Sequence, residues 1–418
     1  MQKRPLFSLF FILFISGCSS VAWQSHPRPD DATIARALNG NNPAIELWDL
    51  PMESLPGFPV PQSVRPCCAF GNKQKVKVGA VPIPLFRLGN TLSPNEVGPH
   101  KFDAGTFAHT SRKMSGNDNR GSENNGVIYT TRGGFIDLAH VRDTADDTVA
   151  LFFEIIRHLG EDRIIEVPDE LGRRYIRLNA TDVSELTTKE RWNLAADLAA
   201  RLAYFKAESH EIAQWHGYAS FAGWPETVSA FSPEDLYSNM LGAKLARALI
   251  GADLVLSSEL YNQNMTAWLD ATLEWLGAVR ESQSRDLFTV VDGRWWDSSR
   301  PIPDKFMVLL RHYDLGDRQL PHIVPSEWIM ESELKKSLLP LVEDLQPPHP
   351  LSLPSHYGDY ELDSMGELVL EVDDKYRDSF GVIPVDLWKQ GFTQLQFAEI
   401  AAWCEKEDVR QLAKLEQE

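Results

Sequence analysis

The sequence lacks the surplus of basic residues that nucleic-acid binding requires. Its 418 residues include 41 Lys and Arg against 59 Asp and Glu, which gives a net charge of -18. A surface this acidic repels phosphate backbones, so we expect no nucleic-acid partner. The proportions of hydrophobic residues, 43%, and of charged residues, 24%, are those of an ordinary globular protein. They exclude a fibrous or wholly disordered chain.

Long apolar runs are absent after the N-terminus. No later segment reaches the roughly 18 uncharged apolar residues that indicate a membrane-spanning helix. The one apolar run, residues 6–15, follows Lys3 and Arg4 and is too short to cross a bilayer. A basic start followed by such a run is typical of a secretory signal peptide. We therefore predict that residues 1–17 are a signal peptide.

The predicted signal peptide ends in Ile15-Ser16-Gly17, directly before Cys18. This segment resembles the lipobox of bacterial lipoproteins, in which an aliphatic residue and two small residues precede the cysteine that is lipidated. The resemblance implies a triacylated Cys18 as the new N-terminus and stable anchoring in a membrane. Ser19 stands where an Asp often marks retention in the inner membrane. We therefore expect a lipid-anchored protein on the periplasmic face of the outer membrane.

Cysteine is scarce, which limits the disulfides that the chain can form. Of four Cys, three remain besides Cys18, namely Cys67, Cys68 and Cys404. We predict one disulfide that involves Cys67 or Cys68, either between these neighbours or with Cys404. A buried thiol is the alternative for Cys404. A metal site on the two adjacent cysteines is disfavoured, because metal-ligating pairs are usually spaced by two or more residues.

Several well-known motifs of enzymes are absent. The sequence contains no Gly-x-Ser-x-Gly elbow, no P-loop and no glycine-rich dinucleotide motif. No internal repeat is visible either. These absences leave serine catalysis and nucleotide binding without support.

Helical patterns dominate the middle of the chain. Residues 187–215 form an Ala-rich helical pattern, and a capping box at residues 232–235 begins another helix. Strand-turn-strand signals occur at residues 127–136 and 163–178. We expect an α+β fold with a predominantly helical core at about residues 140–280 and with short strands and hairpins packed around it.

The composition also predicts how the chain is divided. Residues 18–60, rich in Pro, Asn and Asp, are expected to form a lipidated tether that leads into the main α+β domain at residues 61–345. Within that domain, residues 288–296 have the pattern of a strand. Residues 346–356 form a Pro-rich linker, and residues 357–418 a small C-terminal extension.

A first polar cluster follows the strand signal at residues 127–136. If a helix begins near His140, then His140, Asp143 and Asp147 lie on one face at spacings of i, i+3 and i+7. Such a face offers one nitrogen and two oxygens to a metal ion. The simpler interpretation is that the acidic residues occupy the first turn of a helix, where they interact well with its dipole.

A second polar cluster lies near the end of the Ala-rich helix. His210 continues its apolar stripe and is expected to point inward, beside Glu211. The pair is similar to the start of the zincin motif, but the residue at i+4 is Gln214, and the next histidine, His216, is at i+6. A satisfied core histidine beside a structural glutamate therefore stays open as an alternative.

Antiparallel packing of the two helices would bring these clusters together. The predicted metal ligands are His140, Asp143, His210 and His216, and the predicted catalytic general base is Glu211. The ion would be zinc or another divalent metal, with an open position for an activated water. A metal-free variant would use Glu211 as the acid of a glycan-cleaving site.

Four segments together resemble a known family. Residues 65–71 read RPCCAFG, residues 134–143 read GFIDLAHVRD, residues 210–211 are His-Glu, and residues 229–239 read SAFSPEDLYSN. They are similar to a family of Gram-negative envelope lipoproteins known only as a domain of unknown function. The similarity covers most of residues 60–400. It implies no activity, no fold and no catalytic residues.

Two hypotheses for the function follow. The first is a metal-dependent hydrolase, anchored in the outer membrane through Cys18, that acts on an envelope polymer such as peptidoglycan. The second is a non-enzymatic envelope lipoprotein that binds an envelope protein or a cell-wall polymer, with its His and Glu residues in a buried network. The first requires the imidazoles of His140 and His210 to lie near a common point.

Overall fold

The computed structural model describes residues 28–40, 54–63, 65, 69–78, 81–83, 91–105, 123–220, 226–343, 345–415 and 417. The predictions for the signal peptide at residues 1–17 and for Cys18, Cys67 and Cys68 lie outside these residues. Cys404 is a buried free thiol in the described part of the chain. No helix among the described residues is long and apolar enough to cross a membrane.

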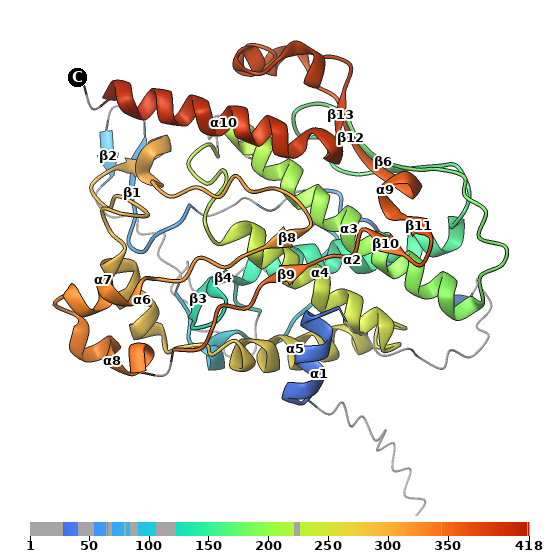
Figure 1. The fold of residues 1–418 in the computed structure, drawn as a ribbon, viewed down its shortest axis with the longest axis horizontal. Helices are drawn as coiled ribbons and strands as arrows, with labels where there is room; N and C mark the ends of the chain where they lie inside the picture. Colours follow the sequence, from blue (N-terminus) through green and yellow to red (C-terminus); the bar gives the residue numbers. More distant parts are fainter. Residues whose placement is uncertain are drawn as a thin grey trace, which may run out of the picture.

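Three long helices form the centre of the molecule (Figure 1). They are α2 (Leu138–His158), α3 (Thr188–Trp215) and α4 (Asp235–Gly251), and each packs against the other two. Six alanines of α3 are fully buried, which lets its neighbours approach closely (Ala195, Ala196, Ala199, Ala200, Ala203 and Ala213). Gly242 has the same effect on α4, because a Cβ there would overlap the carbonyl oxygen of Val141 on α2. The predicted helical core and α+β class are therefore confirmed.

Side chains fix where the core helices begin. Asp137 caps α2 by accepting hydrogen bonds from the backbone N–H groups of Ala139 and His140. A capping box of Thr187 and Glu190 starts α3, whose span at residues 188–215 agrees with the helical pattern predicted at residues 187–215. The helix α4 begins at Asp235, two residues after Pro233, the first helical position that the predicted capping box at residues 232–235 indicated.

Smaller helices surround this centre. α1 (Asp31–Leu38) and α5 (Ser258–Trp275) pack against α4. The others are α6 (Glu281–Val290), α7 (Ser326–Glu331), α8 (Lys335–Glu343), α9 (Leu362–Met365) and α10 (Gln394–Leu415). The helix α6 includes residues 288–290, so the strand predicted over residues 288–296 is wrong.

A four-stranded antiparallel sheet packs against α3 through its strand β12. Its order is β13 (Phe392–Thr393), β12 (Gly366–Leu370), β6 (Arg174–Leu178) and β5 (Arg163–Glu166). The hairpin of β5 and β6 confirms the signal at residues 163–178. The hairpin of β3 (Val127–Thr130) and β4 (Gly134–Asp137) confirms the earlier one and leads directly into α2. The remaining strands are β1 (Lys75–Val78), β2 (Val81–Ile83), β7 (Pro301–Ile302), β8 (Arg318–Gln319), β9 (Leu351–Ser352), β10 (His356–Tyr357) and β11 (Tyr360–Glu361).

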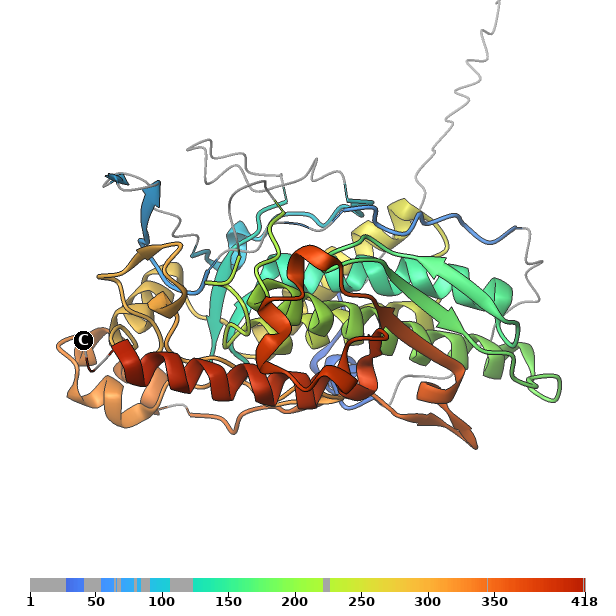
Figure 2. The ribbon, with the colours of Figure 1, turned by 90° about the horizontal axis from the view of Figure 1, so that it is seen from above.

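The C-terminal residues belong to the same folded body. β12 pairs with β6 across almost 200 residues of sequence, and α10 runs along one long side of the molecule against α3 (Figure 2). β9 lies in the predicted linker at residues 346–356 and pairs with β8. The expected separate extension at residues 357–418 therefore shares the sheet and the core of the main domain. Apolar residues such as Phe397 and Ile400 explain this, because α10 can bury them only against the rest of the chain.

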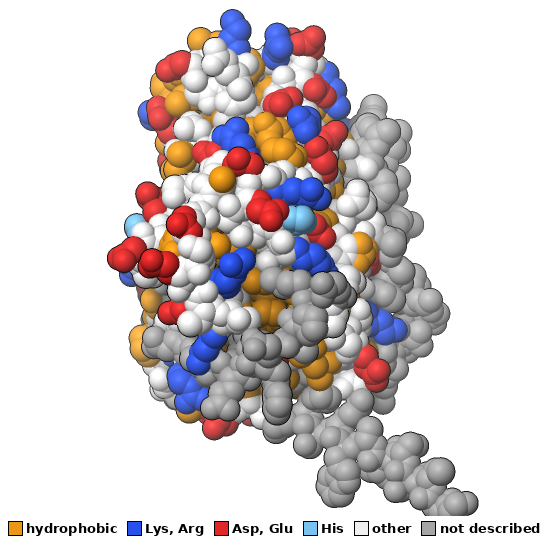
Figure 3. Space-filling view, turned by 90° about the vertical axis from the view of Figure 1, so that its right-hand side faces the viewer, with side chains coloured by type: hydrophobic (Ala, Val, Ile, Leu, Met, Phe, Trp, Pro, Cys, Tyr) orange, Lys and Arg blue, Asp and Glu red, His pale blue; other side chains and the backbone are white. Residues whose placement is uncertain are grey.

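Charges of both signs are spread over the surface. On the end of the molecule drawn in Figure 3, acidic and basic side chains lie next to one another. The net charge of -18 is therefore not gathered into one acidic face there.

Candidate functional site

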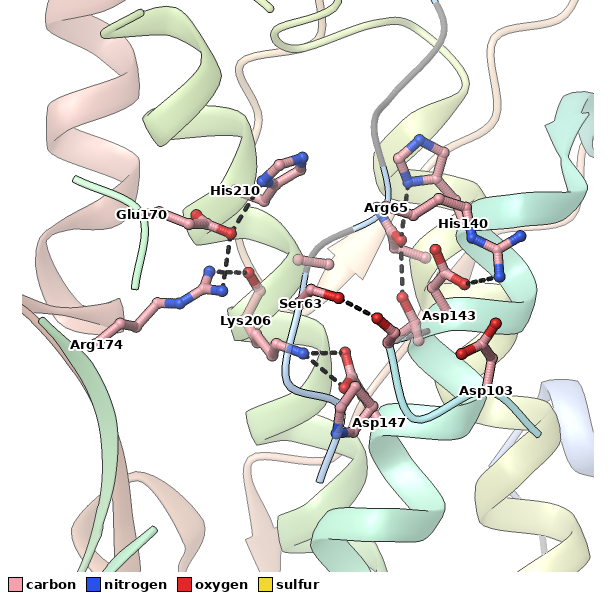
Figure 4. Close-up of a pocket in the computed structure, with 15 residues that line it drawn as sticks. Ser63, Arg65, Asp103, His140, Asp143, Asp147, Glu170, Arg174, Lys206 and His210 are labelled. Carbon is pink, nitrogen blue, oxygen red and sulfur yellow. Dashed lines mark hydrogen bonds and ion pairs between the residues drawn. The ribbon is translucent and has the colours of Figure 1, made fainter. Parts of the chain in front are cut away.

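A small charged pocket lies between α2, α3 and α4 (Figure 4). Residues 61, 63 and 65, together with 103 and 105, cover one side, and the turn between β5 and β6 contributes Glu170. The cavity has a volume of about 80 Å3. Its lining residues are Pro61, Ser63, Arg65, Asp103, Gly105, His140, Asp143, Thr144, Asp147, Glu170, Arg174, Lys206, Ala207, His210 and Asn239.

One face of α2 supplies a wall of this pocket. His140, Asp143 and Asp147 all line it, as their spacing on one helical face predicted. Asp146 points away from the pocket and accepts hydrogen bonds from the hydroxyl of Tyr261 at 2.7 Å and from the N–H of Asp103 at 2.9 Å. The simpler interpretation, acidic residues in a first turn, therefore does not describe α2, since these residues come after the helix has begun.

Asp143 is the most exposed ionisable group on this wall of the pocket. Its side chain is 37% exposed and forms an ion pair with Arg65, whose guanidinium lies 3.0 Å from Oδ1 and whose side chain is only 8% exposed. Burial among other acidic groups raises the pKa of Asp143 to about 7, although Arg65 opposes the shift. Near neutral pH this carboxyl group can therefore both take up and release a proton.

A second ion pair joins α2 to α3. The ammonium group of Lys206 donates to both carboxylate oxygens of Asp147, at 2.6 and 2.7 Å. Burial raises the pKa of Asp147, and Lys206 works against this shift. Removing one partner of such a buried pair leaves an uncompensated charge, which costs about 3–5 kcal/mol.

A third group of charges contains His210. Its Nδ1 donates to Oε1 of Glu170 at 3.0 Å, and that oxygen also lies 2.8 Å from Nη2 of Arg174. The Nε2 of His210 lies 3.0 Å from the amide nitrogen of Gln214, within hydrogen-bonding distance. Burial disfavours the imidazolium, but the Glu170 carboxylate outweighs it and raises the pKa of His210. Both ring nitrogens are engaged, which is the arrangement of a satisfied core histidine.

His140 faces His210 from the opposite side of the pocket. Its Nδ1 lies 3.2 Å from Oδ1 of Asn239, and its Nε2 lies 3.3 Å from the buried carboxyl of Asp235. Burial lowers the pKa of His140 below its ordinary value, although Asp137 opposes this. The ring is therefore neutral at neutral pH.

Two of the predicted site residues lie elsewhere. Glu211 is fully buried, and its Oε2 accepts a hydrogen bond of 2.6 Å from the N–H of Phe231. The ring of His216 stacks on Phe380 with centroids 3.6 Å apart, and its Nδ1 lies 3.0 Å from Oγ of Ser379. Burial lowers the pKa of His216 to about 3. Neither side chain lines the pocket.

The donor groups of this region do not form the predicted metal site. Among the described residues, no group of three or more His, Cys, Asp or Glu side chains is arranged to hold a metal ion. His210 uses both of its ring nitrogens in hydrogen bonds, and His216 packs on the C-terminal segment instead. The expected ligand set of His140, Asp143, His210 and His216 is therefore not assembled, and we assign no step to a metal.

The sequence patterns missed the basic half of the pocket. Lys206 interrupts a run of apolar residues on α3, and this is the signal that could have identified it. Arg174 opens a strand and is fully buried, which no local pattern indicates. Arg65 and Asp103 belong to irregular segments whose position depends on long-range contacts.

A buried network fixes the segment that carries Asp103. His100 is buried between Asp146, 2.9 Å from its Nε2, and Glu123, 3.3 Å from its Nδ1. Three backbone N–H groups of this segment donate to side chains of α2 and α5 (those of His100, Phe102 and Asp103). The cover of the pocket is thus held by specific hydrogen bonds.

Comparison with known proteins identifies the family. Residues 55–325 match the family described as Protein of unknown function (DUF4056). The chain belongs to this family. The matched residues include the whole lining of the pocket. No curated protein and no solved structure matches the chain. The resemblance to a domain of unknown function is thus confirmed, whereas the envelope lipoprotein character stays a prediction.

Proposed function

We propose that this protein is a lipoprotein of the outer membrane that hydrolyses an envelope polymer, such as peptidoglycan, by metal-free acid–base catalysis in the pocket. The observation that carries the proposal is Asp143, a carboxyl group with a pKa of about 7 that remains accessible from the cavity. Catalysis by a general acid or base is most efficient when its pKa lies near the working pH.

The proposed reaction adds one water molecule across the bond that is cleaved. The Asp143 carboxylate removes a proton from the water as its oxygen attacks the electrophilic atom of the substrate. The protonated carboxyl then gives that proton to the leaving group, so the hydroxyl ends on one product and the hydrogen on the other. Arg65 stabilises the charged state of Asp143 at 3.0 Å. His140, which is neutral at this pH, lies on the same helical face.

Replacement of the carboxyl tests this role. We expect Asp143→Asn to lower kcat/KM for the release of soluble fragments from dye-labelled peptidoglycan by about 10²–10⁴-fold, the usual contribution of a general acid or base. Asp253→Asn is the matched control, because burial also raises the pKa of Asp253, to about 6, but this residue does not line the pocket. Equal activity of Asp143→Asn and the wild type would exclude Asp143 as the catalytic group.

A second candidate function is a binding module without catalysis. It is favoured by the hydrogen-bond partners at both ring nitrogens of His210 and by the ion pair of Lys206 with Asp147. Satisfied buried networks stabilise a fold and do not need to react. Binding of peptidoglycan by a wild-type protein that releases no fragments would select this candidate.

The anchor is proposed from the residues at 15–18. The order of a basic start, a short apolar run and Cys18 supports lipidation and a location on the periplasmic face of the outer membrane. We expect Cys18→Ala to lose labelling by a radioactive fatty acid and to leave the membrane fraction. Cys404→Ala is the matched control, and unchanged labelling of Cys18→Ala would exclude the anchor.

A further inference from the structure

We propose that the pocket binds a small zwitterion, the ammonium and carboxylate of an amino acid or of a peptide end, rather than a sugar. This inference rests on the proposed function and specifies which part of an envelope polymer enters the site, namely its peptide. Three features of the pocket carry it: its charges of both signs, their unequal exposure and the chemical nature of the lining.

The charges of the pocket occur as compensated pairs. Arg65 pairs with Asp143 at 3.0 Å, and Lys206 pairs with Asp147 at 2.6 Å (Figure 4). The two charged groups of an ion pair can separate only if each of them finds a new partner, because an isolated buried charge is very costly. A ligand that carries one charge satisfies one end and leaves the other unpaired. A zwitterion satisfies both and leaves the net charge of the pocket unchanged.

The exposure of these side chains indicates how the ligand lies. The carboxylates are the more accessible ends, with 37% of Asp143 and 13% of Asp147 exposed, against 8% for both Arg65 and Lys206. The two carboxylates come from one face of α2, and Lys206 faces them from α3. The ammonium group of the ligand therefore lies against α2, and its carboxylate lies toward the two cations.

The lining disfavours a sugar ring. None of the described lining residues is Phe, Tyr or Trp. A sugar presents apolar C–H faces, which are best covered by flat aromatic side chains, and most ligand pockets are lined by such residues. The volume of about 80 Å3 also fits a small polar group better than a segment of a glycan strand.

Binding of defined small ligands to the full-length protein in detergent tests the inference. Titration calorimetry would compare alanyl-alanine, its N-acetylated form, its C-terminal amide and an oligomer of N-acetylglucosamine. We expect the zwitterionic dipeptide to bind, each blocked form to bind at least about tenfold more weakly, and the sugar not to bind. Equal binding of the blocked forms, binding of the sugar alone, or no binding of the dipeptide at about 1 mM would overturn the inference.

A paired variant identifies the site of binding. Asp147→Asn combined with Lys206→Met removes both members of one ion pair, so that no unpaired charge is left in the core. We expect this variant to fold and to lose binding of the dipeptide by at least about tenfold. The matched control is Asp197→Asn with Arg247→Met, another buried pair between core helices that lies outside the pocket. Equal losses in the two double variants would show that the pocket is not the site.

These outcomes separate the inference from the proposed hydrolase. Binding of the dipeptide without release of fragments from peptidoglycan would keep the inference and exclude the enzyme. Release of fragments that depends on Asp143, without binding of any zwitterion, would keep the enzyme and exclude the inference.

Discussion

At the scale of single residues, the environment of a carboxyl group decides its role. Asp143 and Glu211 both have a pKa of about 7, and burial is the main cause in each. Asp143 faces the cavity and can exchange protons with a ligand or with water. Glu211 is fully buried in the core. It accepts a hydrogen bond from the backbone N–H of Phe231, whose φ of 56° is rare for a bulky residue. Its role is therefore to fix the loop before α4.

This role predicts how stability depends on pH. The folded pKa of Glu211 is raised from 4.5 to about 7, so its contribution is fully present below pH 4.5 and declines as the pH rises through 7. Glu211→Gln keeps an acceptor for the N–H of Phe231 but carries no charge. We expect the loss of unfolding free energy between pH 5 and pH 8 to be smaller in this variant, by about 2 kcal/mol, in urea denaturation.

The matched control is Glu399→Gln, which changes an exposed glutamate of α10. It should leave the pH dependence of the wild type unchanged. If the unfolding free energy declined equally with pH in Glu211→Gln and in the wild type, ionisation of Glu211 would not be the cause of the decline.

At the scale of helices, the close approach of α2 and α4 brings two walls of the pocket together. α2 contributes His140 and Asp143, while α4 contributes Asn239. The two helices meet where Gly242 faces the backbone of Val141. Packing at this point therefore fixes the distance between the walls of the site.

Filling this contact is expected to destabilise the protein. Gly242→Ala places a methyl group against the carbonyl of Val141, and the helices must separate to admit it. Overpacking of this kind costs about 1–3 kcal/mol, more than alanine gains in helix propensity. Gly381→Ala is the control, because a Cβ at that position meets no atom within 4 Å. Thermal unfolding that is unchanged in Gly242→Ala would contradict the packing described here.

Local patterns predicted several elements well. The span of α3 follows from its helical pattern, and the two hairpins follow from turn signals, which act within a few residues. The face of α2 with Asp143 follows from helical spacing. The strand predicted at residues 288–296 failed because a short apolar run fits a buried helix equally well.

The pairing of side chains across the site could not be predicted in this way. Lys206 meets Asp147 across 59 residues, and His210 meets Glu170 across 40 residues. His216 follows α3 directly, yet its ring packs on Phe380, which belongs to a distant segment. Such contacts depend on the packing of whole elements and leave no local pattern.

At the scale of the whole molecule, residues beyond the family match complete the fold. The match ends at residue 325, whereas β12 and α10 add a strand and a long helix to the same body. Asp408 of α10 links the two parts. It accepts hydrogen bonds from Trp215 at 3.0 Å and from the hydroxyl of Tyr313 at 2.6 Å, and it pairs with Lys305.

Loss of this buried charge is expected to loosen α10. Asp408→Asn leaves Lys305 without its partner and should lower the unfolding free energy by about 3 kcal/mol in urea denaturation. Hydrogen exchange in α10 should rise more than exchange in α2. Glu405→Gln, one turn earlier and exposed, is the control. Equal stability of Asp408→Asn and the wild type would contradict an anchoring role.

The central claim is that Asp143 exchanges protons during hydrolysis, and the pH profile of kcat/KM tests it most directly. With fragment release from peptidoglycan as the assay, we predict that kcat/KM rises as Asp143 ionises, with an inflection near pH 7. The inflection should disappear in the residual activity of Asp143→Asn. A profile without an inflection near pH 7, or the same inflection in Asp143→Asn, would contradict the account.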